Sequence, residues 1–302
     1  MPQETILVIG GTGLLGRIVA RHLLDDGFLV RALVRNVDRA RCQLGPDVEL
    51  RLGDIDDGAA IAQALEGCSS VHISLASARP EDADRVEYRG TARVAELAAQ
   101  QGLARLTYVS GMLVGKQWTD GIAQHQAKLR AEQAIRRSGV PYTIFKPTYF
   151  MDTLPRHIQG SLAVVLGRQP HAYHMTAACD FARMVARALR SPEAANREFF
   201  VHVPEAITIP DALRLYCRLV EPGKRVITLP LWFMRMIDTM FLHRKLHDTL
   251  ELMALMQQVG ERGDRVEANR VLGAATTTLR QWCEQQRRHR SEQNRTSRLE
   301  PA

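Results

Sequence analysis

The chain has 302 residues, of which 45% are hydrophobic and 24% are charged, with a formal net charge of +7. These are the values of an ordinary globular protein, and they exclude a chain that is disordered throughout. The length favours two domains, or one large α/β domain with an extension. No apolar run approaches the ~18 residues of a membrane-spanning helix, and the short apolar run near the N-terminus predicts a first strand rather than a secretory signal.

The five cysteines are odd in number and scattered, without a CxxC pair. This pattern favours a reduced, cytoplasmic protein without a cysteine metal site, and we expect no metal. Residues 285–302 contribute +3 of the net charge of +7, because they hold five arginines against two glutamates, and they lack apolar periodicity. We predict a basic, disordered tail there, with an RNA or anionic-membrane contact as the minor alternative, and no nucleic-acid function for the chain.

The first half alternates strands and helices. Apolar runs predict the strands, and apolar residues at helical spacing predict the helices. Strands that are separated by single helices imply right-handed crossovers and a parallel sheet with helices on both faces. The expected fold class is therefore α/β, a doubly wound parallel sheet, in a first domain of residues 1–150. Its expected strands are 6–9, 28–34, 48–52, 71–76, 106–110 and 142–146, and its expected helices are 14–23, 59–65, 87–100 and 123–137.

The second half is less regular, and we predict a smaller α+β substrate region over residues 151–284. Residues 231–259 are rich in Met, Leu and Phe, which predicts two amphipathic helices over a core or pocket; a peripheral membrane contact is the alternative. Leu279 and Trp282 belong to an expected last helix. The other expected elements are helices 180–190 and 209–219 and strands 199–203 and 226–229.

A glycine-rich loop follows the first expected strand and opens a helix. Residues 10–16 are GGTGLLG, which contains GxxGxxG from Gly10 and GxGxxG from Gly11. Glycines permit the tight turn and a close approach of the backbone to a pyrophosphate, and the helix N-terminus then presents N–H groups to it. In this context the loop predicts a dinucleotide-binding (Rossmann) site rather than a turn alone.

The end of the second strand bears on the choice between NADH and NADPH. An acidic residue there would hold the ribose 2′-hydroxyl of NADH. The chain instead reads Leu-Val-Arg-Asn, with Arg35 and Arg39 basic and no acid before Asp38. Because arginine pairs well with phosphate, Arg35 predicts NADP(H), although a solvated strand end is the alternative role.

With these residues in place, the chain resembles the atypical short-chain dehydrogenase/reductase families, specifically the NmrA-like and isoflavone-reductase-like group. The resemblance covers about residues 4–284. Its most specific stretches are ILVIGGTGLLGRIVARHLLDDGFLVRALVRN and KLRAEQAIRRSGVPYTIFKPTYFMD, and shorter likenesses are LGDIDD, DFARMVARALRSPEAANREFFV and LGAATTTLRQWC.

The resemblance implies roles for single residues. Asp54 would approach the adenine, with an N-cap of the next helix as an equal alternative, and Ala76 would lie along the cofactor ribose. Ser110 matches the family's serine at the end of the fifth strand, and Pro147 would lie between nicotinamide and substrate. Thr12 and the loop glycines Gly10, Gly11, Gly13 and Gly16 would contact the pyrophosphate, and the adjoining Leu14 and Leu15 would also belong to the cofactor-binding site.

Lys128 is the main catalytic candidate. In reductases of this superfamily a Tyr and a Lys lie four residues apart on one helix; the Lys binds the ribose hydroxyls and lowers the tyrosine pKa. Here the tyrosine position is Gln124, which is not an acid. His125 and Tyr149 are weaker candidates for the donor, and the default expectation for His125 is an exposed helix histidine. Isoflavone-reductase-like members act with the lysine alone, so catalysis stays open.

Two functions follow from the resemblance. One is an NADPH-dependent reductase that transfers hydride to a small carbonyl, enone or quinone-like acceptor. The other is a non-catalytic NAD(P)H-binding sensor, regulator or assembly factor with a regulatory protein partner. The missing tyrosine favours the second, and the retained Lys128 with the apolar C-terminal segment favours the first. The sequence does not indicate a substrate or an oligomeric state.

Overall fold

The computed structural model describes residues 4–299 apart from 116, 119 and 244, and the side chains only to residue 292. The chain forms two compact units, each of which is discontinuous in sequence. The first unit is residues 1–148, 178–201 and 262–274, and the second is residues 149–177, 202–261 and 275–302. The expected domain boundary at residue 150 is therefore close to the first point at which the chain passes from one unit to the other, and the chain passes between the units several more times.

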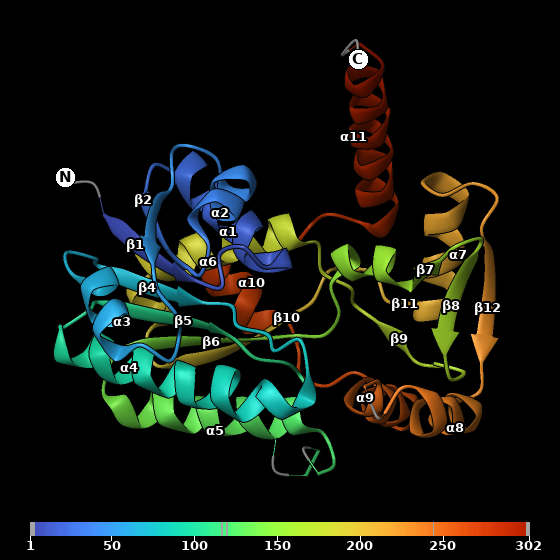
Figure 1. The fold of residues 1–302 in the computed structure, drawn as a ribbon, viewed down its shortest axis with the longest axis horizontal. Helices are drawn as coiled ribbons and strands as arrows, with labels where there is room; N and C mark the ends of the chain where they lie inside the picture. Colours follow the sequence, from blue (N-terminus) through green and yellow to red (C-terminus); the bar gives the residue numbers. More distant parts are fainter. Residues whose placement is uncertain (1–3, 116, 119, 244, 300–302) are drawn as a thin grey trace. The chain divides into compact units, whose positions relative to one another are not determined.

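The first unit contains a parallel sheet of seven strands in the order β10-β6-β5-β4-β1-β2-β3 (Figure 1). The doubly wound α/β prediction is confirmed. All six strands expected in the first half are present, and most of them are apolar runs buried on both faces. The strands are β1 (Thr5–Ile9), β2 (Leu29–Val34), β3 (Glu49–Leu52), β4 (Ser70–Ile73), β5 (Arg105–Val109), β6 (Tyr142–Pro147) and β10 (Arg197–Val201).

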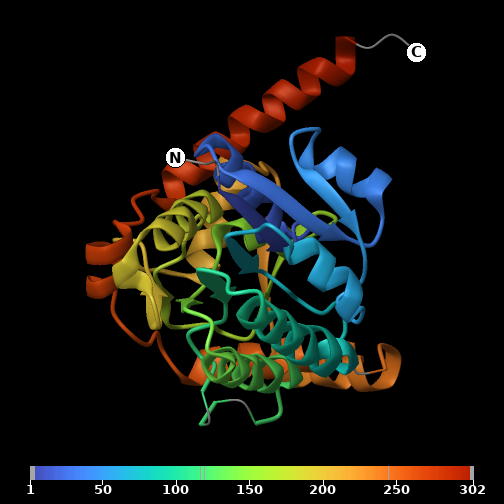
Figure 2. The same ribbon diagram turned by 90° about the vertical axis from the view of Figure 1, so that its left-hand side faces the viewer.

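Helices cover both faces of this sheet. In Figures 1 and 2, α3, α4 and α5 lie on one face, while α1, α6 and α10 lie on the other. The buried core between sheet and helices includes Leu7, Ile61, Val71 and Ile144. The helices are α1 (Leu14–Asp25), α2 (Val37–Leu44), α3 (Gly58–Leu65), α4 (Thr91–Gln100), α5 (Ala123–Ser138), α6 (Ala178–Arg190) and α10 (Val266–Leu272), with short turns η1 (Pro80–Asp82), η2 (Asp84–Gly90, π-helical) and η4 (Pro192–Ala194).

Four elements of the first unit differ from the expectation. The strand expected at 199–203 is β10, and it joins the main sheet by pairing in parallel with β6. The helices α2 and α10 were not expected, because they are only eight and seven residues long. The helix expected from residue 87 begins as the π-helical turn η2 and continues as α4.

The second unit holds two small sheets. One has the order β12-β8-β7, and the other pairs β11 with β9. The helix expected at 209–219 is α7 (Ile209–Leu219), where Thr208 caps the first turn by accepting from the Asp211 N–H. The strands are β7 (Ile158–Gln159), β8 (Leu162–Leu166), β9 (Ala172–Tyr173), β11 (Ile207–Thr208) and β12 (Arg225–Leu229), and η3 (Met151–His157) is 3₁₀-helical.

The apolar segment 231–259 forms the two expected helices, α8 (Leu231–Phe241) and α9 (His247–Gln258). The expectation of a disordered tail is wrong for residues 285–299, because these residues belong to helix α11, which runs from Leu279 to Leu299. Glutamine, glutamate and arginine are good helix formers, and the Arg290 guanidinium lies 2.6 Å from the Glu221 carboxylate. Within the described residues, no helix is long and apolar enough to cross a membrane.

A candidate dinucleotide site at the carboxyl edge of the sheet

The strand order reverses beside β1, where doubly wound folds have their binding crevice. Its neighbours are β2 on one side and β4 on the other, so the chain direction across the sheet reverses between β1 and β4. In doubly wound folds, ligands bind at this reversal, outside the carboxyl ends of the strands. The glycine loop follows β1, and the residues from Ser74 to Ser77 follow β4 at the same edge. The structure therefore brings both segments to the edge of the sheet where doubly wound folds bind ligands.

The conformation of the loop explains two of its glycines. Gly10 has a φ of +81°, which side chains disfavour, and a Cβ there would overlap the Ser74 carbonyl. A Cβ on Gly16 would overlap the carbonyl of Gly10. These two glycines are thus required by the fold itself, because β1, the loop and α1 pack backbone against backbone.

Gly13 has a different environment. It is the N-cap of α1, has an ordinary φ of −75° and donates its N–H to the Gly10 carbonyl at 2.9 Å. A Cβ on Gly13 would meet only the Gly10 oxygen, at 3.1 Å. Thr12 and Gly13 are exposed, Leu14 and Leu15 are half-buried, and Gly11 is buried. Gly13 is thus not required by packing within the fold. Its lack of a side chain instead keeps the outer surface of the N-terminus of α1 open.

The end of β2 carries the expected basic group. Arg35 and Arg39 are exposed, and no described acidic side chain forms an ion pair with either of them. The intervening Asn36 caps α2 by accepting from the Arg39 N–H at 2.8 Å. This cap holds the start of α2 beside the strand end, so the two guanidinium groups remain available to an anionic ligand.

The surroundings of Asp54 and Ala76 say less about a role in cofactor binding. The Asp54 carboxylate accepts from the Asp56 N–H at 3.1 Å, whereas the N-cap of α3 is Asp57, which accepts from Ala59 and Ala60. The alternative role of Asp54 as helix cap is therefore wrong, and its contact with adenine stays a prediction. Ala76 is exposed after β4, as a residue lying along a ribose would be.

Lys128 takes part in a polar network at the edge of the sheet. Its ammonium lies 3.2 Å from a Glu87 carboxylate oxygen and donates to the Val109 carbonyl at the end of β5. Glu87 is 1% exposed, and its other oxygen accepts from the Ser77 hydroxyl at 2.6 Å and from the Ser77 N–H. Gln124, in the position of the family's tyrosine, donates to the Ser77 carbonyl at 3.2 Å. Lys128 is thus already held by a buried carboxylate.

Ser110 belongs to a second network, which is built on Glu132, one helical turn after Lys128 on α5. Its hydroxyl donates to the buried Glu132 carboxylate at 2.5 Å. Glu132 also pairs with Arg136 at 2.9 Å and with Lys146 at 3.3 Å, and Lys146 pairs with Glu198 at 2.9 Å. Ser110 therefore has a structural partner, and its catalytic role stays a prediction. Pro147, the last residue of β6, is buried and accepts from the Met112 N–H at 3.1 Å.

The two candidate proton donors are both half-buried. Desolvation and the nearby Lys128 charge lower the pKa of His125 from 6.5 to about 4, so this imidazole is neutral at neutral pH. The default expectation of an exposed helix histidine is therefore wrong. In the second unit, the Tyr149 hydroxyl is hydrogen-bonded to His157 Nε2 at 2.7 Å, and desolvation raises the Tyr149 pKa. Neither group has the pKa of an effective acid at pH 7.

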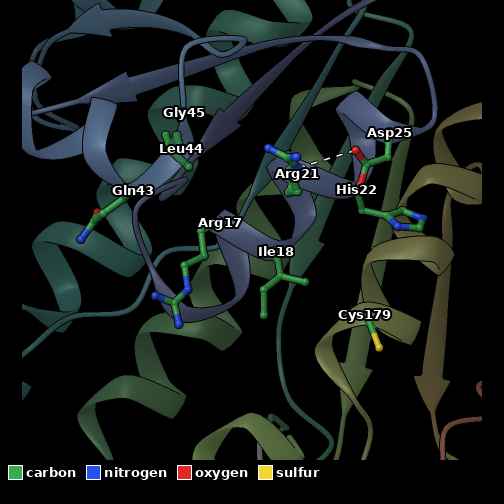
Figure 3. A pocket seen from close by; sticks show the side chains of 9 residues that line it. All are labelled: Arg17, Ile18, Arg21, His22, Asp25, Gln43, Leu44, Gly45 and Cys179. Atoms are coloured by element: carbon green, nitrogen blue, oxygen red, sulfur yellow. Dashed lines mark ion pairs between the residues drawn. The ribbon is translucent and has the colours of Figure 1, made fainter. Parts of the chain in front are cut away.

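A separate cavity of about 500 Å³ opens along the outer side of α1 (Figure 3). Arg17, Arg21 and Asp25 project from α1 toward it, with Gly45 and Cys179 on neighbouring elements. Arg21 pairs with Asp25 at 3.6 Å. None of the residues predicted to bind cofactor lines this cavity. Its lining groups therefore add nothing to the dinucleotide site.

Sequence reasoning missed two members of the site. Glu87 is the partner of Lys128 and is buried in the π-helical turn η2. In the sequence it is only one acidic residue in an amphipathic helix, so nothing there indicated its burial or its partner. Ser77 joins Gln124 to Glu87, and its place after β4 was a weak signal. Asn36 was detectable, since it precedes a short helix in the manner of an N-cap.

Comparison with known proteins agrees with this geometry. A family profile described as NAD(P)H-binding matches residues 10–192. A (4-alkanoyl-5-oxo-2,5-dihydrofuran-3-yl)methyl phosphate reductase of Streptomyces griseus is 35% identical over 208 residues, which are 67% of this chain and 69% of the relative. A photosystem II assembly factor of Trieres chinensis is 27% identical over 244 residues, or 78% of this chain and 76% of the relative.

Solved structures show the same fold. The NADPH complex of an NADPH-dependent quinone oxidoreductase from Escherichia coli has a TM-score of 0.75 at 20% identity and covers 93% of this chain and 99% of its own. The NADP(H) complex of a triphenylmethane reductase from Citrobacter sp. has a TM-score of 0.72 at 19% identity, with 94% and 99% covered. These likenesses concern the fold.

Proposed function

Because the chain belongs to the NAD(P)H-binding family, with the fold of the atypical short-chain dehydrogenases/reductases that its sequence resembles, we propose that it is an NADPH-dependent reductase of enone or quinone-like acceptors. The observation that supports this most is the placement of Lys128. It reaches the end of β5, while the glycine loop occupies the end of β1 and packs against Ser74 after β4. The loop and the lysine thus lie at the carboxyl ends of β1 and β5, the two strands that flank β4.

The residues of the crevice fit a reduced dinucleotide phosphate. The N-terminus of α1 offers N–H groups to the pyrophosphate, and the exposed Arg35, assisted by Arg39, holds the 2′-phosphate. Lys128 contacts the nicotinamide ribose and contributes positive charge where an acceptor gains negative charge. A bound NADPH supplies the hydride; these side chains bind and orient it.

The class of acceptor follows from the missing acid. Gln124 is an amide, and the neutral His125 has a pKa of about 4, so no group identified on α5 is a strong donor at neutral pH. A ketone becomes an alkoxide that needs a proton as it forms. A quinone or enone becomes a delocalised anion, which Lys128 stabilises and solvent protonates later. The site therefore suits acceptors whose reduced anion is stable without an enzymatic acid.

The test is NADPH oxidation with a panel of quinones, enones and simple ketones. The proposal predicts turnover with members of the first two classes and none with the ketones. Reduction of ketones at comparable rates would contradict the acceptor class, while NADPH binding by calorimetry without any oxidation would contradict the reductase itself.

A second function has one observation in its favour. The Lys128–Glu87 ion pair and the Gln124–Ser77 hydrogen bond occupy the catalytic positions with structural contacts. A cofactor sensor or assembly factor needs only such a rigid site, and one relative is an assembly factor by name. Affinity capture with and without NADPH tests this alternative, which predicts a specific protein partner whose recovery depends on the cofactor.

A further inference from the structure

The second unit contains a cluster of three metal-binding side chains. His174 follows β9, His202 lies between β10 and β11, and Glu261 follows α9. One ligand atom from each residue lies within 4.8 Å of the other two. Residues from three separate segments of the chain thus converge on one point, and the reductase proposed above does not use them.

The contacts within the cluster are close. The imidazole Nδ1 of His174 contacts one Glu261 carboxylate oxygen, and the other oxygen accepts from the His174 N–H at 3.0 Å. His202 Nε2 lies 3.7 Å from that second oxygen. The two imidazole rings stack, with centroids 5.4 Å apart and an interplanar angle of 16°. The carboxylate therefore lies against both rings.

The cluster is buried at one end and open at the other. The side chain of His202 is 4% exposed and that of Glu261 is 11% exposed, while that of His174 is 29% exposed. This gradient provides an entry on the side of His174. A small ion could therefore reach the carboxylate without unfolding of the unit.

Hydrogen bonds fix the backbone on which the cluster is built. The Tyr173 hydroxyl donates to the Met256 carbonyl at 2.6 Å, and Gln169 donates to the Met253 carbonyl at 2.8 Å. Both bonds tie the segment before His174 to α9, which precedes Glu261. Two of the three candidate ligands are thus preorganised relative to each other.

We propose that His174, His202 and Glu261 bind a divalent transition-metal ion of the zinc type. Imidazole nitrogens and a carboxylate oxygen are donors that Zn²⁺ prefers, and three protein ligands leave one position for water. Ligand atoms about 2.1 Å from a tetrahedral ion are roughly 3.4 Å apart. The ligand atoms now lie within 4.8 Å of one another, and side-chain rotations would bring them to this separation.

Zn²⁺ and Co²⁺, added to metal-free protein, are the probes. We expect one Zn²⁺ per chain by calorimetry, an increase in Tm, and a Co²⁺ visible spectrum typical of four-coordinate geometry. Glu261→Gln retains an acceptor for the His174 N–H but removes the anionic ligand. This variant and His202→Gln are expected to lose more affinity than the roughly 10- to 100-fold that follows a change outside the ligand shell.

His171→Gln is the matched control, because His171 lies in the same segment but outside the cluster. It is expected to bind Zn²⁺ like the wild-type chain. Circular dichroism and NADPH binding identify any variant that fails to fold. Absence of stoichiometric Zn²⁺ binding, or equal losses in His171→Gln and Glu261→Gln, would overturn the proposal and leave a structural His–Glu pair only.

Discussion

The ammonium of Lys128 lies 3.2 Å from the carboxylate of Glu87, a residue that is 1% exposed. The lysine of the proposed site is therefore also part of the fold. An ion pair with a buried member is strongly destabilised when one partner is removed, because the remaining charge is uncompensated. A test of Lys128 must therefore separate its effect on stability from its effect on turnover.

Lys128→Met is expected to lower the free energy of unfolding by about 3 kcal/mol, because it leaves Glu87 buried without its cation. It should also slow NADPH oxidation by about 10²–10³-fold through loss of positive charge near the acceptor. Denaturant unfolding and steady-state kinetics measure the two effects.

The double variant Lys128→Met with Glu87→Gln separates them. The side-chain amide introduced by Glu87→Gln still accepts from Ser77 and carries no charge, so stability is expected to recover while turnover stays low. Recovery of turnover together with stability would show that Lys128 is only structural.

Gly13→Val is expected to abolish NADPH binding with little loss of stability. Its Cβ would meet only the Gly10 carbonyl oxygen, at 3.1 Å, but its methyl groups would occupy the surface that faces the pyrophosphate. Calorimetric titration with NADPH and a thermal melt measure both properties. Gly58→Ala, in the first turn of α3, is the matched control. Normal NADPH affinity in Gly13→Val would show that the loop does not hold the cofactor.

Arg35→Ala is expected to weaken NADPH binding by roughly 10- to 150-fold, the equivalent of about 1.5–3 kcal/mol for hydrogen bonds to a charged group. NADH lacks the 2′-phosphate, so its affinity should not change. Arg51→Ala, at the exposed end of the neighbouring strand β3, is the control. Equal wild-type affinities for NADPH and NADH would remove Arg35 from the site.

His72 is expected to make the fold sensitive to acid. Burial lowers its pKa from 6.5 to about 3, so the unfolded chain binds a proton at a pH where the folded chain does not. Stability from this residue is complete above pH 6.5 and declines as the pH falls from 6.5 toward 3, by on the order of 5 kcal/mol. Denaturant unfolding from pH 7 to pH 4 measures the decline.

His72→Gln keeps a partner for Thr107, whose hydroxyl lies 2.8 Å from His72 Nδ1. It should reduce the slope of stability against pH, whereas the exposed His289→Gln should not. An unchanged slope in His72→Gln would mean that other groups cause the acid sensitivity.

The fold of the first unit was largely predictable, because most of its strands are continuous apolar runs and Gly10 and Gly16 are required where β1, loop and α1 meet. The assignment of β10 to the same sheet was not, since its pairing with β6 joins residues far apart in sequence. The same limit applies to the site. Arg35 and Lys128 stand in recognisable positions, but the contact between Lys128 and Glu87 is tertiary and has no local pattern.

We propose that the site performs hydride transfer and does not merely bind NADPH. Single-turnover stopped-flow tests it directly: protein with one bound NADPH is mixed with a quinone or an enone, and the loss of reduced-nicotinamide absorbance is followed. We expect complete oxidation of bound NADPH by at least one such acceptor, slowed about 10²–10³-fold in the Lys128→Met, Glu87→Gln double variant. Bound NADPH that survives every acceptor in the panel would contradict it.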